Sequence, residues 1–256
     1  MTLERSLYDE PALYDRVVAP PAASLGFYLD EARRGGGDVL ELACGTGRLT
    51  IPIARALAPE GRRVTALDLA PAMLDAAQRK AADATVDIEL VVGDMRRFKL
   101  DRRFDTIFVA FNSLLHLTTN DELRHCFACV REHLAPDGAF VFDIFNPSIK
   151  LLARAPEERS TVARVADEEL GEIHLETTID YDAATQVNRA TWYISTPDQR
   201  DAWTVPLFLR SIFPQELPLL LSAAGLELIN RFGELDRAPF GARSRVQVCL
   251  CRRSGA

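Results

Sequence analysis

Short apolar runs alternate with helical stretches along the first 150 residues of the chain. The apolar runs predict strands at residues 38–43, 63–68, 88–92, 104–109 and 139–144. Helical signals lie between them at residues 48–57, 71–82 and 121–134. Strands that alternate with helices form right-handed crossover units, so we expect a parallel sheet that is covered by helices on both faces.

The pattern changes after Asn146-Pro147. Residues 161–213 are rich in Thr, Val, Ile, Tyr and Trp with a period of two, which predicts three or four antiparallel strands. A helical signal returns at residues 214–224, and residues 226–231 and 244–251 are expected to form closing strands. The sequence has no repeat or long linker, so we expect the extra strands to be an insertion packed on the α/β core. The aromatic side chains of these strands, Trp192, Tyr193, Trp203 and Phe208, are expected to lie mostly in the core.

Composition narrows the class of protein. The 256 residues include 37 acidic and 30 basic side chains, a net charge of −7, and a chain without basic excess is a poor partner for nucleic-acid phosphates. No apolar run approaches the ~18 residues of a membrane span. The first residues are charged where a secretion signal is apolar. We therefore expect a cytoplasmic protein with no nucleic-acid or membrane partner; its oligomeric state stays open.

The five cysteines do not indicate a metal site. Cys126 and Cys129 form a C-x-x-C pair, and His125, Cys129 and His133 recur every four residues on one face of a predicted helix. A structural zinc site needs a fourth ligand and usually a second ligand pair, which the sequence does not offer. We expect buried helical thiols and surface histidines, and no metal.

Candidate chemistry lies at three predicted strand ends. The first strand leads into Glu41-Leu-Ala-Cys-Gly-Thr-Gly47, whose glycines allow a ligand to approach the backbone closely. The second strand ends at Asp68, a carboxylate that can accept both hydroxyls of a ribose, and the third ends at Gly93-Asp94-Met95. In a doubly wound sheet these ends meet at one edge, where ligands bind.

At these strand ends the chain resembles the class I S-adenosylmethionine-dependent methyltransferases. The segment from Glu41 to Gly47 resembles the family's first motif, and the resemblance implies that Asp68 binds the ribose of S-adenosyl-L-methionine. It also implies that Leu69 flanks the adenine and that Asp94 contacts it. The expected cofactor-binding residues are Glu41, Ala43, Gly45, Gly47, Asp68, Leu69, Asp94, Met95 and Phe111.

The resemblance implies an α/β fold with a doubly wound, mostly parallel, seven-stranded Rossmann-like sheet and an antiparallel β insertion after the fifth strand. Residues 1–256 then form one methyltransferase domain. Within it we expect an N-terminal helical cap at 1–35 and a cofactor-binding core at 36–147. Inserted strands at 160–213 would cover the acceptor site, and residues 214–256 would supply the closing helix and strands.

A nicotinamide-binding Rossmann domain is the competing interpretation. Its fingerprint needs a third small residue three positions after the second glycine, where this chain has Thr50. Glu41 also opposes it, because a carboxylate repels a pyrophosphate but attracts an ammonium or sulfonium group. The charges favour the methyltransferase.

The acceptor side is predicted from the fourth strand end. Enzymes that methylate nucleic-acid bases typically carry Asn-Pro-Pro-aromatic here, whereas this chain reads Asn112-Ser-Leu-Leu, which is similar to small-molecule, nucleotide-sugar-type N-methyltransferases. That resemblance implies that His116 and an N-terminal tyrosine, Tyr14 or Tyr8, face the acceptor. The alternative roles are a partly buried structural histidine and aromatic anchors. The expected catalytic residues are His116 and Tyr14, and the expected substrate-binding residues are Tyr8, Asn112 and Trp192.

The sequence therefore favours transfer of a methyl group from S-adenosyl-L-methionine to an amine nitrogen of a small molecule. Methyl transfer from a sulfonium is an in-line displacement in which positioning does most of the catalysis. O-methylation of a small molecule is the alternative reaction. A non-catalytic S-adenosylmethionine sensor would carry the same cofactor motifs. The identity of the acceptor is not readable from the sequence.

Overall fold

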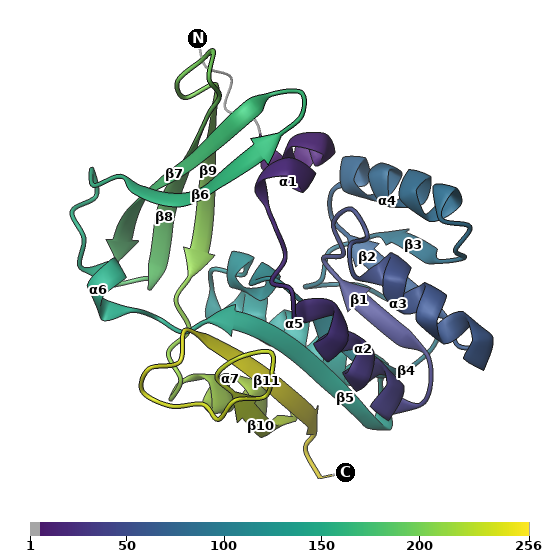
Figure 1. The fold of residues 1–256 in the computed structure, drawn as a ribbon. Helices are drawn as coiled ribbons and strands as arrows, with labels where there is room; N and C mark the ends of the chain where they lie inside the picture. The colour runs from purple at the N-terminus through teal and green to yellow at the C-terminus, as the bar shows by residue number, and fades with distance from the viewer. Residues whose placement is uncertain (1–5, 256) are drawn as a thin grey trace.

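Two β-sheets organise the chain in the computed structural model, which describes residues 6–255 (Figure 1). Predictions that fall on residues 1–5 and 256, at the ends of the expected cap and closing segment, lie outside the described residues. The larger sheet has seven strands in the order β10-β11-β5-β4-β1-β2-β3. Its strands are β1 (Val39–Leu42), β2 (Val64–Asp68), β3 (Glu89–Val92), β4 (Phe104–Val109), β5 (Leu134–Phe145), β10 (Leu226–Phe232) and β11 (Val246–Arg253).

This sheet confirms the predicted fold class. Strands β1 to β5 pair in parallel, while β11 runs antiparallel to both β5 and β10. The strand order reverses beside β1, which is the position where doubly wound sheets bind ligands. Strand β5 begins at Leu134, earlier than the predicted 139–144, and continues directly from the preceding helix.

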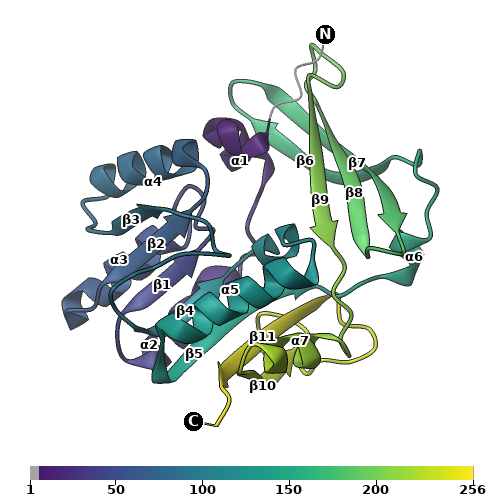
Figure 2. The same cartoon turned by 180° about the vertical axis from the view of Figure 1, so that it is seen from behind.

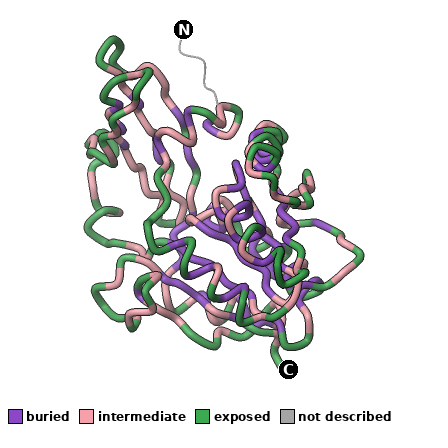
Figure 3. The backbone as a smooth tube through the Cα atoms, turned by 45° about the vertical axis from the view of Figure 1, so that its right-hand side comes forward, coloured by how far each residue is buried: buried purple, intermediate pink, exposed green. Residues whose placement is uncertain are grey.

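Helices cover both faces of the larger sheet (Figures 1 and 2). Phe27 and Tyr28 of α2 and Ile53 of α3 pack on one face, and Phe127 of α5 and Leu217 of α7 pack on the other. Buried backbone accordingly concentrates in the central strands (Figure 3). The helical segments are η1 (Leu7–Asp9), α1 (Pro11–Val17), α2 (Ser24–Gly35), α3 (Thr50–Leu57), η2 (Ala58–Glu60), α4 (Pro71–Asp83), η3 (Ser113–His116), α5 (Asn120–His133), α6 (Ile149–Leu152) and α7 (Leu217–Ala223).

The inserted strands form a separate antiparallel sheet in the order β6-β7-β8-β9. Their bounds are β6 (Ser160–Asp167), β7 (Gly171–Asp182), β8 (Val187–Ser195) and β9 (Trp203–Arg210). One face of this sheet, which includes Leu175, Ile194 and Val205, packs on Leu13 and Val17 of α1. The N-terminal helix therefore lies between the small sheet and the parallel core (Figure 1).

One core prediction in the insertion is wrong. Phe208 was expected to be mostly core, but 53% of its surface is exposed. Side chains alternate along a strand, and Val205 and Leu207 of β9 take the face that packs on α1. Phe208 therefore points to the opposite face. Within residues 6–255, no helix combines the length and apolar character needed to cross a bilayer.

Candidate active site

The turn after β1, residues 43–47, contains two glycines and so exposes main-chain atoms at the edge of the sheet. Ala43, Gly45 and Gly47 all have positive φ angles, of 56°, 55° and 79°. A Cβ atom at Gly47 would lie 3.1 Å from Cδ1 of Ile51 and 3.3 Å from Cβ of Ala77, so this glycine lets α3 and α4 approach the turn. A Cβ atom at Gly45 would meet only the ring of Tyr14, at 4.0 Å. There is therefore space between the turn at Gly45 and the ring of Tyr14.

Glu41 lies beneath this turn. Its side chain is 3% exposed, and Oε2 accepts a hydrogen bond from the hydroxyl of Thr50. Burial raises the pKa of Glu41 to about 8, and the nearby charge of Asp68 acts in the same direction. Thr50 occupies the position where a dinucleotide fingerprint requires a small residue, and here it holds the carboxyl group. The site therefore places a buried acid under the turn, where a cation would stabilise its ionised form.

Asp68 ends β2 directly beside the turn. Its Oδ2 accepts the N–H of Gly45 at 2.8 Å, and its Oδ1 accepts the N–H of Ala70 at 2.9 Å. Burial raises the pKa of Asp68. The next residue, Leu69, is 64% exposed and offers an apolar surface at the same edge. A half-buried carboxylate beside open backbone and an apolar side chain fits a ligand that carries both hydroxyls and a flat ring.

Asp94 lies at the neighbouring strand end but is already engaged. Both of its carboxylate oxygens accept hydrogen bonds from Arg96, which also pairs with Glu122 of α5. This pairing with Arg96 lowers the pKa of Asp94. Met95 packs half-buried against the core. The proposed contact of Asp94 with adenine stays a prediction, and it would have to use lone pairs that Arg96 leaves over.

The two predicted tyrosines and the predicted histidine come together although they are far apart in sequence. The hydroxyl of Tyr8, on η1, lies 2.8 Å from Nε2 of His116, the last residue of η3. The rings of Tyr8 and Tyr14 have centroids 6.1 Å apart. Burial lowers the pKa of His116 and raises the pKa values of Tyr8 and Tyr14, so all three side chains are neutral at pH 7.

The remaining predicted acceptor residues lie on two different elements. Asn112 precedes η3 in a left-handed conformation, with φ 63°, and within residues 6–255 its buried Oδ1 has no hydrogen-bond partner. Phe111 before it also has a positive φ, of 56°. Trp192 of β8 packs half-buried in the apolar cluster that includes Tyr14 and Trp203.

Sequence reasoning missed two charged groups that hold these elements. Asp15 of α1 accepts hydrogen bonds from Thr46 at 2.7 Å and from Arg48 at 2.9 Å, and it pairs with Lys80 of α4. Arg48 also donates to the carbonyl oxygen of Tyr14 at 3.1 Å. These contacts tie α1 to the glycine turn. No local pattern marks Asp15, because its partners lie more than 30 residues away.

The second missed group is Asp143, near the end of β5. Its carboxylate accepts hydrogen bonds from the hydroxyl of Tyr28 and from the N–H of Phe111. The lone acid within the apolar run at 139–144 is a sequence signal that could have indicated it.

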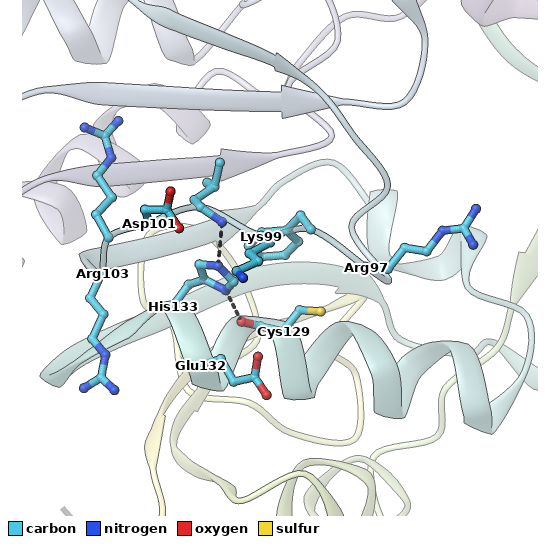
Figure 4. Close-up of a pocket in the computed structure, with 10 residues that line it drawn as sticks. Arg97, Lys99, Asp101, Arg103, Cys129, Glu132 and His133 are labelled. Carbon is cyan, nitrogen blue, oxygen red and sulfur yellow. Dashed lines mark hydrogen bonds between the residues drawn. The ribbon is translucent and has the colours of Figure 1, made fainter.

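A cavity of about 700 Å³ lies between the C-terminal part of α5 and residues 97–103, which join β3 to β4 (Figure 4). His133 is buried there, contrary to the expectation of a surface histidine, and both of its ring nitrogens are engaged. Nε2 accepts the N–H of Leu100 at 2.9 Å, and Nδ1 donates to the carbonyl oxygen of Cys129 at 2.7 Å. His133 is therefore a structural residue.

The described part of the chain contains no cluster of His, Cys, Asp and Glu able to hold a metal ion.

The chain is similar in sequence to known methyltransferases. Residues 39–138 match a family model described as a methyltransferase domain. The chain is 29% identical to the cypemycin N-terminal methyltransferase of a Streptomyces species over 253 residues, which cover 97% of this chain and 98% of that one. It is 32% identical, over 57% of its length and 56% of the relative's, to a dTDP-3-amino-3,6-dideoxy-alpha-D-glucopyranose N,N-dimethyltransferase of Streptomyces fradiae.

Two solved methyltransferase structures match the fold of this protein over nearly its whole length. The CcbJ methyltransferase of Streptomyces caelestis superposes with a TM-score of 0.80 at 28% identity and covers 98% of this chain and 99% of its own. An S-adenosylmethionine-dependent methyltransferase of Clostridium acetobutylicum superposes with a TM-score of 0.78 at 20% identity, covering 98% of this chain and 100% of its own. The latter match is evidence for the fold alone.

Proposed function

Because the chain belongs to the class I S-adenosylmethionine-dependent methyltransferases, we propose that it methylates an amine nitrogen of a small-molecule acceptor. The observation that carries this proposal is the hydrogen bond between Tyr8 and His116 at the edge of the sheet where the glycine turn lies. The names of the relatives support the same class of acceptor, since one acts on the N-terminus of cypemycin and another on an amino sugar.

The residues around the glycine turn fit S-adenosyl-L-methionine. When bound, this cofactor supplies a methyl group on a positively charged sulfur, which leaves as a neutral thioether. Asp68 would hold the ribose hydroxyls, and Leu69 would lie against the adenine. Glu41 would favour the cationic part of the cofactor through the buried carboxyl under the turn. Ala43, Gly45 and Gly47 would present backbone that no side chain obstructs.

Tyr8 and His116 would manage the proton of the acceptor. An amine attacks through its lone pair, so it must arrive neutral and must lose a proton once the new bond to carbon has formed. Both side chains are neutral at pH 7 because burial raises the pKa of Tyr8 and lowers that of His116. The phenol oxygen of Tyr8 can take the proton of the amine while its own proton passes to Nε2 of His116 over 2.8 Å.

Tyr14, Asn112 and Trp192 would shape the rest of the acceptor site. Tyr14 lies between the glycine turn and Tyr8, so it would line the wall where donor and acceptor meet. Asn112 offers a buried amide oxygen that can accept an N–H of the acceptor. Trp192 would contribute the apolar roof from the inserted sheet. The net charge of −7 and the absence of an Asn-Pro-Pro motif support a small molecule rather than a nucleic acid.

Turnover with defined acceptors tests this proposal. The protein is incubated with methyl-labelled S-adenosylmethionine and, in parallel, with an amino sugar nucleotide, a peptide with a free N-terminus, and the matching hydroxyl analogues. Mass spectrometry then locates the added methyl group. Label on nitrogen supports the proposal, and label on oxygen alone indicates the O-methyltransferase alternative. A protein that S-adenosylhomocysteine stabilises against heat but that labels no acceptor or metabolite extract would be a sensor.

A further inference from the structure

The backbone between β4 and η3 adopts an unfavourable conformation twice in succession. Phe111 and Asn112 have φ angles of 56° and 63°, in the left-handed region. Asparagine tolerates this region, but a bulky residue such as phenylalanine rarely enters it. Such conformations persist only where surrounding structure holds them, and they cluster at functional sites. The turn therefore requires an identifiable support.

Asp143 supplies this support from the adjacent strand. Its Oδ1 accepts the N–H of Phe111 at 3.0 Å and also the hydroxyl of Tyr28, while its backbone carbonyl accepts the N–H of Asn112 at 3.3 Å. The parallel pairing of β4 with β5 ends at Val109, opposite Phe142. Asp143 is the next residue of β5 after Phe142. It continues the contact between the two chain segments by binding the turn with its side chain and its main chain.

The contacts of Asp143 with Tyr28 and with the Phe111–Asn112 turn, called the clamp here, are buried. Asp143 is 6% exposed and Tyr28 is fully buried. Tyr28 belongs to α2, and its ring stacks on Phe108 of β4 with centroids 4.8 Å apart. This stacking fixes the position of the phenol that donates to Asp143. A buried carboxylate is costly unless donors satisfy it, and here two donors converge on the same oxygen atom.

The turn leads directly to the two groups that the proposed function uses on the acceptor side. Asn112 presents a buried Oδ1 that lacks a partner among the described residues. Four residues later, His116 ends η3 and contacts Tyr8. A small change in the φ angles of the turn would move both groups, and misplacement by about 1 Å can cost a hundredfold in rate.

We propose that Asp143, supported by Tyr28, is a positioning residue for methyl transfer: it holds the Phe111–Asn112 turn so that Asn112 and His116 face the acceptor. This inference rests on the proposed function insofar as the turn borders the acceptor site. Asp143 itself contacts neither donor nor acceptor. Its role is to fix the position of the groups that do.

The hydroxyl of Tyr28 and the N–H of Phe111 both donate to Oδ1 of Asp143, so variants can remove the acceptor or one donor separately. Asp143→Asn keeps an Oδ1 that accepts from Tyr28 and from Phe111, so the clamp survives. Asp143→Leu has a similar shape and removes the acceptor. Tyr28→Phe removes one donor and keeps the ring. Leu226→Ala is the control for stability, because this fully buried side chain lies at the start of β10, opposite Arg253 of β11.

The experiment measures kcat, acceptor KM, cofactor affinity and melting temperature for each variant. We expect Asp143→Leu to lower kcat by about tenfold or more and to leave cofactor affinity within about twofold. Asp143→Asn should stay within about threefold of the parent kcat, and Leu226→Ala should lose stability but retain kcat. A parental kcat in Asp143→Leu, or an equal loss of kcat in Leu226→Ala, would overturn the proposal.

Hydrogen exchange provides a readout that needs no acceptor. The amides of Phe111 and Asn112 should be protected in the parent protein and in Asp143→Asn, and should exchange faster in Tyr28→Phe, which keeps the proposal testable if Asp143→Leu does not fold. Unchanged protection in Tyr28→Phe and Asp143→Leu would count against the clamp. A parent protein that methylates no amine would instead contradict the proposed function, whatever the exchange of these two amides shows.

Discussion

The hydroxyl of Tyr8 lies 2.8 Å from Nε2 of His116 across 108 residues of sequence. Their rings meet edge to face with centroids 5.6 Å apart. This contact joins the N-terminal segment to η3, the short helix that follows β4, and sets a phenol against an imidazole that burial keeps neutral. The pair therefore carries the proposed proton transfer, and it is the first target for mutation.

Replacing Tyr8 with phenylalanine should lower kcat by about 100-fold or more, because a positioned proton-transfer group contributes on the order of 10²–10⁴ in rate. The ring that packs beside Tyr14 is kept, so cofactor affinity should not change. Tyr193→Phe is the matched control, since its hydroxyl lies 3.5 Å from the hydroxyl of Thr178 on the inserted sheet and takes no part in the proposed relay. Steady-state kinetics with a saturating acceptor measures the effect, and a parental kcat in Tyr8→Phe would exclude the relay.

The pH dependence of the reaction should reveal His116. A proton acceptor works when it is neutral, so activity is present above its pKa and is lost as the pH falls through it. Burial lowers this pKa below its ordinary value of 6.5. The acid limb of kcat/KM due to His116 should therefore lie below pH 6.5. His116→Gln should remove that limb and keep any limb that belongs to the acceptor amine, and a limb that survives unchanged would reject the assignment.

The sequence predicted the larger sheet well because its central strands β1, β2 and β4 are buried along nearly their whole length and appear as apolar runs. The strand ends with Glu41 and Asp68 were also visible, since chain order alone brings parallel strand ends to one edge. Asp143 was not, because its function depends on Tyr28, 115 residues away. Phe208 was predicted on the wrong face, because the alternation of side chains along β9 does not reveal which face of the small sheet packs on α1.

Asp68→Ala should weaken binding of S-adenosylhomocysteine by about 1.5–3 kcal/mol, which is the range for hydrogen bonds that involve a charged group. The carboxylate lies beside Gly45 and is already desolvated, so its bonds to ribose hydroxyls would cost little further dehydration. Isothermal titration calorimetry gives the dissociation constants. Asp83→Ala, at the exposed end of α4, should bind as the parent does. Equal affinity in the Asp68 variant would refute the ribose assignment.

Arg48→Met should loosen α1. The guanidinium binds Asp15 and the carbonyl oxygens of Tyr14 and Val18, so one side chain ties the whole C-terminal end of the helix to the glycine turn. We expect faster hydrogen exchange in residues 11–17 and a local loss on the order of 2 kcal/mol. Arg55→Met is the control, because Arg55 is exposed and donates to the carbonyl oxygen of Ala84, away from α1. Protection of α1 that is equal in both variants would show that the tie is unimportant.

Glu41 should make the protein less stable as the pH rises. Burial raises its pKa in the folded chain from 4.5 to about 8. Between these values the unfolded chain has released the proton and the folded chain still holds it. The unfolded state then binds fewer protons, so the free energy of unfolding contributed by this group falls from about pH 5 to pH 8. Above pH 8 the folded chain also ionises and the contribution levels off.

Glu41→Gln tests this argument, since glutamine keeps an oxygen that accepts from Thr50 but carries no titratable proton. We expect the variant without cofactor to gain stability over the parent as the pH is raised from 5 to 8, by roughly 2 kcal/mol or more. Urea unfolding at several pH values measures the difference. Glu132→Gln, an exposed acid on α5, should show no such trend. A constant difference between Glu41→Gln and the parent across this range would mean that Glu41 is already ionised in the folded protein, and the proposed response to a bound cation would fail with it.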